Sequence, residues 1–313
     1  MSLAACLTIY STVVLVVGPA VLRRLSRAGH APRLGVTAWL AAIGSMLATW
    51  LVVAGLLVVD VAAHWGQRNS FVVACVAALC ELAAGDAGRA AQVGVLVGLA
   101  TVVVVMARFA IRIGRTIARL RAQAHGHAQA IRLVGRPTPD EDVYVVDATA
   151  RAAYCVAGRP SAIVVTSSAI AALDRHELGA VIAHERAHLR GHHPAVMTVL
   201  RGLALVFPRL GLMTQAAHEV SRLLEMCADD AAARRHGCDP LINGLMALVG
   251  VAPAAALGAA DVAVLSRAER LLSPPQHRAC IGAQLALAGA AALVIAAPMT
   301  MVALGAVGIL VCS

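Results

Sequence analysis

The sequence predicts an α-helical integral membrane protein that carries an α+β domain on the cytoplasmic side of the membrane. Two observations favour this class. Of the 313 residues, 60% are hydrophobic and only 14% are charged, a balance too apolar for an ordinary soluble domain. The apolar residues gather in long segments near both ends, whereas the middle of the chain carries short strand-like runs followed by helical patterns.

Four segments reach the roughly 20 apolar residues that a membrane-spanning helix needs. They are residues 3–22, 34–63, 90–113 and 281–311. No basic residue precedes the first apolar run, and arginines follow it, so we expect a retained span rather than a signal peptide. Three parts of the chain follow from this division: residues 1–113 with three transmembrane helices, a domain at residues 114–278, and a fourth transmembrane helix within residues 279–313.

The arginines predict the orientation, because basic residues accumulate in cytoplasmic loops. Four arginines lie between the first two spans, and five lie at or just beyond the inner end of the third, from Arg108 to Arg121. The loop between spans two and three holds only Arg68 and Arg89, against Glu81 and Asp86. We therefore expect a multi-pass protein of the cell membrane, with the central domain in the cytoplasm and the N- and C-termini outside.

The basic residues also exclude several functions. All 26 are arginine, so the chain has no Schiff-base lysine, no phosphate-loop lysine and no Ser-x-x-Lys acylation site. A net charge of +9 would suit a nucleic acid, but the arginines concentrate at membrane edges, where anionic lipid explains them. We expect the lipid bilayer as a partner and no direct contact with nucleic acid.

The most informative pattern is H-E-x-x-H at His184, Glu185 and His188. Residues four apart share one face of a helix, so both imidazoles can bind one zinc ion, while Glu185 reaches a water molecule and takes its proton. A catalytic zinc needs a third protein ligand, and Glu225 in a later E-x-x-A-D pattern supplies it if a second helix lies alongside. Asp229 is then expected to accept a hydrogen bond from a ligand imidazole.

The flanking residues predict that both motifs are helical. Asp174 and Glu177 form a capping-box pattern before the first motif, and Pro194 is expected to stop that helix after His193. An apolar stripe runs along the same helix at Leu178, Val181, Ile182 and Leu189. The second helix is expected to end near Gly237.

The identity of the third ligand separates two classes of zinc site. In the longer metzincin pattern H-E-x-x-H-x-x-G-x-x-H, Gly191 occupies the glycine position, but Pro194 stands where the third histidine belongs. A carboxylate ligand is therefore favoured, which predicts a gluzincin (zincin-like) metallopeptidase domain. We expect His192 to stay off the metal, and Arg186 and His193 to lie on the solvated face.

Strand-like runs occupy residues 143–146, 153–156 and 161–168. The last precedes the metal-binding helix directly, so we expect it to be the sheet edge that takes an extended peptide, with an ordinary core strand as the alternative. Residues 195–213 join the two predicted metal-binding helices and cannot cross the membrane once, so they either do not cross or return as a hairpin. We expect a helix packed in the domain or lying on the membrane surface. Residues 241–260 are expected to form a core helix.

This order of spans and motifs resembles the BlaR/MecR-type antirepressor membrane metallopeptidases. The resemblance rests on residues 183–188, 163–166, 225–229 and 265–272. It implies zinc as the cofactor and a transcriptional repressor of the BlaI/MecI type as the protein substrate. The sensor members carry a penicillin-binding domain after the last span, and the sequence ends at Ser313 without it, so direct sensing of a β-lactam is not expected.

Three functions remain open at this stage. The first is a signalling protease that cleaves the repressor, the second an HtpX-like quality-control protease with the same zinc motifs, and the third a non-catalytic zinc-binding receptor or scaffold. For the two proteases, zinc would acidify a water molecule and Glu185 would act as general base. Peptide hydrolysis also needs a hydrogen-bond donor to the oxyanion of the tetrahedral intermediate. Candidates near Glu225 in the sequence are His218, Arg222, Arg234 and His236, and none is assigned. No oligomeric state follows from the sequence.

Overall fold

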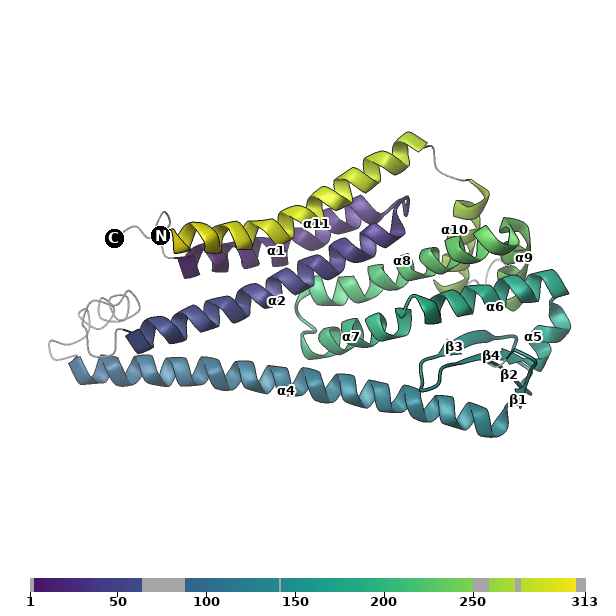
Figure 1. Ribbon diagram of the computed structural model, residues 1–313, viewed down its shortest axis with the longest axis horizontal. Helices are drawn as coiled ribbons and strands as arrows, with labels where there is room; N and C mark the ends of the chain where they lie inside the picture. Colours follow the sequence, from purple (N-terminus) through teal and green to yellow (C-terminus); the bar gives the residue numbers. More distant parts are fainter. Residues whose placement is uncertain (1–2, 64–87, 141, 250–258, 274–276, 308–313) are drawn as a thin grey trace.

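The computed structural model describes residues 3–63, 88–140, 142–249, 259–273 and 277–307. Long helices dominate these residues, and one small sheet lies towards the end of the molecule away from both termini (Figure 1). Three stretches of earlier predictions lie outside the described residues. They are the loop between the second and third predicted spans (residues 64–87), residues 250–258 of the segment 241–260, and residues 308–311 of the fourth predicted span.

Three apolar helices lie side by side: α1 (Leu3–Ser26), α2 (Pro32–Ala63) and α11 (His277–Ala306) (Figure 1). Each is long and apolar enough to cross a membrane. Their outward side chains are apolar as well, for example Val16 at 73% and Leu293 at 68% exposure, which fits contact with lipid. Hydroxyls of Tyr10 and Ser45 both donate to the carbonyl of Val294, at 2.6 and 2.8 Å, and so connect the three helices.

Helix α4 (Gly88–Val134) is continuous over 47 residues. Its first part contains the predicted third span, which stays a prediction; the exposed run Val102–Val105 supports it. The predicted boundary between residues 113 and 114 falls inside this helix. The same rigid element therefore reaches from the predicted membrane segment to the sheet (Figure 1).

The sheet has the strand order β1-β2-β4-β3. Its strands are β1 (Arg136–Pro137), β2 (Val143–Val146), β3 (Ala153–Val156) and β4 (Ala162–Thr166). Strand β4 pairs in parallel with β2 and antiparallel with β3, and all five of its residues are buried. The prediction that this strand forms the sheet edge is therefore wrong, and β3 is the edge strand on that side.

Alternating side chains of the strands serve two faces of the sheet. Ala162 and Val164 pack with Ala128 and Ile131 of α4 on one face. Ile163 and Val165 face α6 (Arg175–Arg190) on the other face, together with Leu178, Ile182 and Leu189 of the predicted stripe. Packing on both faces explains why β4 has no polar alternation, and it fixes α6, which carries the H-E-x-x-H motif, against the sheet.

The segment between the two motifs forms a helical hairpin. Helix α7 (His193–Val206) leads away from α6, and α8 (Gly211–His236) lies antiparallel beside it (Figure 1). Near the turn, Phe207 stacks on Phe109 of α4 with ring centroids 5.0 Å apart and meets Trp50 of α2 edge-on. Buried residues of α7 and α8 share one core with α1, α2 and α11. The helix expected within residues 195–213 is therefore packed against its neighbours, one of the expected outcomes, and the chain turns back after it.

The remaining helices surround the far end of α8. Helix α5 (Ser167–Ala172) follows β4, α9 (Cys238–Val249) packs on α6 through Leu241 and Leu245, and α10 (Ala259–Leu272) lies against α9. Residues 241–249, which belong to α9, thus form part of a core helix, as predicted for residues 241–260.

Candidate metal centre

The start of α6 is fixed by its cap. Asp174 Oδ1 accepts hydrogen bonds from the backbone N–H groups of His176 and Glu177, both at 2.8 Å, and Glu177 accepts one from the Asp174 N–H at 3.0 Å. This is the predicted capping box. The helix ends earlier than predicted, at Arg190, and Pro194 lies in the first turn of α7 instead. His192 takes a left-handed conformation, φ 53°, between the two helices.

Helix α8 carries the second motif past α6. Leu223, Leu224 and Met226 are buried in the shared core, while Ala228 and Ala232 are buried along the same helix. The small side chains of Ala228 and Ala232 let α8 approach α6 closely. The helix ends at Gly237, whose φ of 89° suits glycine and confirms the predicted end.

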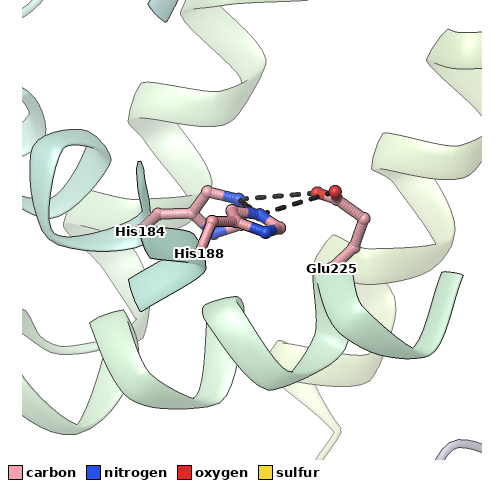
Figure 2. Close-up of side chains that lie close together, drawn as sticks. All are labelled: His184, His188 and Glu225. Carbon is pink, nitrogen blue, oxygen red and sulfur yellow. Dashed lines mark hydrogen bonds and ion pairs between the residues drawn. The ribbon is translucent and has the colours of Figure 1, made fainter. Parts of the chain in front are cut away.

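The two helices bring His184, His188 and Glu225 together (Figure 2). The Nε2 atoms of the two imidazoles lie 3.1 Å apart. Glu225 Oε2 lies 3.4 Å from His184 Nε2, and Oε1 lies 3.5 Å from His188 Nε2. Two nitrogens and one carboxylate therefore converge on one point, with both histidines buried.

Asp229 lies beside His184, although the geometry between the two side chains is that of an ion pair and not of the expected hydrogen bond. Its Oδ1 is 3.1 Å from His184 Nδ1, the nitrogen that points away from the convergence point. Asp229 is fully buried, and Arg267 of α10 donates to both of its oxygens, at 2.6 and 2.8 Å. Arg267 Nη1 also lies 3.1 Å from Glu225 Oε2. One guanidinium therefore supports two carboxylates of the site.

The second imidazole, His188, also has a buried partner, which is His193. His193 is buried, and its Nδ1 lies 2.9 Å from His188 Nδ1. The expectation that His193 lies on the solvated face is wrong, because the turn at residues 191–192 folds the start of α7 back towards α6. Arg186 does lie nearer the surface, where it pairs with Asp142 and Asp140.

Carboxylates and positively charged groups balance each other at the site. Burial raises the pKa of Glu225, but hydrogen bonds from His184 and His188 outweigh burial and bring the pKa well below its usual range. Burial lowers the pKa of His184, but Asp229 and Glu225 outweigh it and raise this pKa to about 9. The convergence point thus holds a carboxylate charge that positive groups compensate.

The donor set fits zinc. The three ligand atoms all lie within 4.8 Å of one another, and they are imidazole nitrogens and a carboxylate oxygen, which zinc prefers in catalytic sites. Asp229 and His193 contact the outward nitrogens of the two imidazoles, which is how ligand histidines are usually oriented. Three protein ligands leave the fourth position of a tetrahedral site for water.

Glu185 lies in a cavity of about 540 Å³ that adjoins these ligands. His188 and Glu225 line the same cavity, as do Cys155 of the edge strand β3 and Arg201 of α7. Burial raises the pKa of Glu185 above its ordinary value, which makes its carboxylate a stronger base. Glu185, two of the three candidate ligands and the edge strand β3 therefore line the same cavity.

None of the four residues considered as oxyanion donors lines this cavity. Arg222 is held by Glu219 and by the carbonyl of Ser26, and His236 lines another cavity on the opposite side of α6. Arg267 was missed because it lies more than 40 residues beyond Glu225 in an amphipathic helix without a motif. Its place in residues 265–272, one of the segments behind the family resemblance, was the only available signal.

Residues 115–269 match the model of Peptidase family M48. The matched region covers just under half of the chain and contains α6, α8 and Arg267. This part of the protein is similar to M48 peptidases, which supports the metallopeptidase class. The broader part of the family resemblance is supported in this way, whereas the BlaR/MecR type is not. No curated protein and no solved structure matches the chain.

Proposed function

We propose that this protein is a membrane-embedded, zinc-dependent endopeptidase. The observation that carries the proposal is the convergence of His184, His188 and Glu225 beside a cavity that also holds Glu185. The M48 match supports the reaction class, and the three apolar helices support the membrane location. In the proposed orientation the peptidase domain is cytoplasmic and both termini lie outside.

Each residue has a definite task in this proposal. Zinc bound by the triad would supply a Lewis acid that polarises the scissile carbonyl and acidifies a water molecule. Glu185 takes the proton of that water on its carboxylate and then delivers it to the leaving amine. Asp229 and His193 hold the two imidazoles in place, and Arg267 keeps Asp229 ionised.

The edge strand β3 suits a peptide substrate. It pairs with β4 on one side, and its residue Cys155 lines the catalytic cavity. An extended peptide that adds to such an edge gains main-chain hydrogen bonds whatever its sequence. We therefore assign to β3 the substrate-binding role that was first expected for residues 161–168.

Replacement of Glu185 by glutamine tests the proposal. The purified protein with Glu185→Gln should keep one zinc ion but hydrolyse an unfolded protein such as casein about 10²- to 10⁴-fold more slowly, because only the general base is lost. Glu219→Gln, which alters a carboxylate of α8 that pairs with Arg222 outside the cavity, is the matched control. Equal activity of the Glu185 variant and the wild type would favour the zinc-binding scaffold.

Two substrate classes follow. The family resemblance implies a cytoplasmic repressor of the BlaI/MecI type, and this is the first candidate. Membrane proteins, the substrates of an HtpX-like quality-control protease, are the second. What supports this candidate is that α8, which carries Glu225, shares one core with α1, α2 and α11, the helices proposed to span the bilayer. Comparison of proteomes with and without active Glu185 separates them: one stabilised regulator indicates signalling, and many stabilised membrane proteins indicate quality control.

A further inference from the structure

Four arginines form a stripe along one face of α4. Arg108, Arg112, Arg115 and Arg119 follow one another at spacings of four, three and four residues, which keeps them within one narrow face of a helix. All four line a cavity of about 1020 Å³ between α4 and the end of α7. They are exposed to this hollow rather than packed in a core.

No acidic side chain lines this cavity among the described residues. Each of the four guanidiniums also lacks a hydrogen bond or ion pair with another described residue, whereas Arg186, Arg222, Arg267 and Arg270 all have carboxylate partners. Like charges placed one turn apart repel each other. A stripe of this kind, unpaired among the described residues, favours the binding of an anionic partner.

The stripe leads towards the catalytic cavity. Leu120 of α4 lines both hollows. Beyond it, Ala124 and His127 of the same helix line the catalytic cavity, where Arg201 of α7 adds another cation. In Figure 1, α4 passes beside α7 and then under β3. One helix thus carries the arginines and borders the proposed site of peptide hydrolysis.

We propose that this stripe, Arg108 to Arg119, is a binding site for an acidic, extended segment of the polypeptide substrate. The inference rests on the proposed peptidase function and adds a substrate class to it. A substrate held along α4 would have its neighbouring residues guided past Leu120 to Glu185 and the triad.

The dimensions favour a polypeptide over lipid headgroups. The stripe spans twelve residues of helix, with roughly 16 Å between its first and last arginine. The headgroup layer of one leaflet is only about 5–8 Å thick, so, with α4 along the membrane normal, it can cover no more than about half of the stripe. Alternate residues of an extended chain lie about 7 Å apart, so three alternate glutamates span about 14 Å and fit within the stripe. A Glu-x-Glu pattern therefore places about three carboxylates along the four arginines.

Peptide binding to the full-length protein tests the proposal. The protein carries Glu185→Gln to prevent cleavage and is placed in nanodiscs of neutral phosphatidylcholine. The probe is a fluorescent ten-residue peptide that alternates glutamate and serine, and anisotropy gives its Kd. Replacement of Arg112, Arg115 and Arg119 by glutamine should weaken binding at least about fivefold, since each exposed ion pair contributes modestly. Replacement of the same three residues by lysine should restore most of the affinity.

The control removes equal charge elsewhere. Arg23→Gln, Arg24→Gln and Arg278→Gln alter exposed arginines of α1 and α11 and should change the Kd less than about twofold. Equal losses in both triple variants, or equal binding of a peptide with glutamine in place of glutamate, would overturn the proposal. It would also be overturned if enrichment of phosphatidylglycerol around the protein depended on the three arginines while peptide binding did not.

Because this assay measures binding by an inactive variant, its outcome is separate from that of the proposed function. In the protein with Glu185 intact, the glutamine triple variant should hydrolyse a short neutral peptide at the wild-type rate. Loss of that activity as well would show that the stripe supports the fold rather than the substrate.

Discussion

Asp229 has no exposed surface, and its charge is held between Arg267 and His184. Burial raises its pKa, but hydrogen bonds from Arg267 and the ion pair with His184 outweigh burial and keep the pKa below its usual value. A buried carboxylate with such partners orients a ligand imidazole and increases its basicity. We therefore expect this residue to act on a bound metal through His184.

Asp229→Asn should lower the affinity for zinc about 10- to 100-fold, because the neutral amide no longer favours the His184 tautomer that binds metal. Competition with a zinc chelator measures the change. The neighbouring Asp230→Asn is the control, since Asp230 pairs with Arg270 away from the triad. Unchanged affinity in the Asp229 variant would contradict the assigned role.

The pKa of His184 gives the site a definite pH dependence. Without metal, this pKa is raised from 6.5 to about 9, so zinc must displace a proton below about pH 9. Zinc affinity should therefore rise between pH 6.5 and 9. The stabilisation from protonated His184 has the opposite trend: it is complete below pH 6.5 and is lost as the pH rises through 9.

Thermal unfolding of the metal-free protein checks this sign. The melting temperature of the chelator-treated protein should fall as the pH increases from 6.5 to 9, and Asp229→Asn should flatten the dependence. A melting temperature that rises over this range would contradict the assigned pKa shift.

Individual site residues were predictable where a motif fixes them. His184, Glu185, His188, Glu225 and Asp229 follow from spacing on two helices, and the structure brings the two histidines and Glu225 together. His193 was misplaced because the end of α6 was predicted three residues too late. The sequence contains Pro194, but a proline suits the first turn of a new helix as well as the end of an old one.

At the scale of elements, the capping box fixes where the metal-binding helix begins. Asp174→Ala removes an acceptor for two backbone N–H groups and should destabilise the protein by about 1 kcal/mol. Thermal unfolding in detergent measures the change. Asp147→Ala is the control, because its pair with Arg136 is largely exposed and should contribute little. Equal shifts for the two variants would contradict the role of the cap.

Strand positions were predicted well, and strand order was not. The runs at residues 143–146 and 153–156 became β2 and β3 with the predicted bounds. The burial of β4 on both faces depends on α4 and α6, which lie on opposite sides of it. A run of apolar residues indicates a buried strand but does not say which strands lie next to it, so the edge was assigned to the wrong strand.

At the scale of the whole molecule, the peptidase domain and the apolar helices are not separate bodies. The core that contains Trp39 and Met46 of α2 also contains Leu212, Met213 and Leu223 of α8. The sequence could not predict this joint core, because the apolar segment at residues 195–213 fits several environments equally well. The packing of Phe207, in the turn between α7 and α8, on Trp50 and Phe109 shows which of these environments the segment occupies.

The proposed orientation of the molecule is testable with reporters. Alkaline phosphatase fused after Ser313 should be active and a green fluorescent protein fused there should be dark, because the C-terminus is expected outside. The same reporters inserted at Ser273, in the predicted cytoplasmic part, should give the opposite result. Fluorescence at Ser313 would reverse the orientation derived from the arginines.

The zinc content of the purified full-length protein tests the central claim most directly. Elemental analysis after removal of loosely bound metal should find one zinc per chain in the wild type and in Glu185→Gln. It should find little or none in His188→Ala or Glu225→Ala, because two ligands do not hold a catalytic zinc. One tightly bound zinc in the Glu225 variant, with unchanged affinity, would contradict the shared metal site.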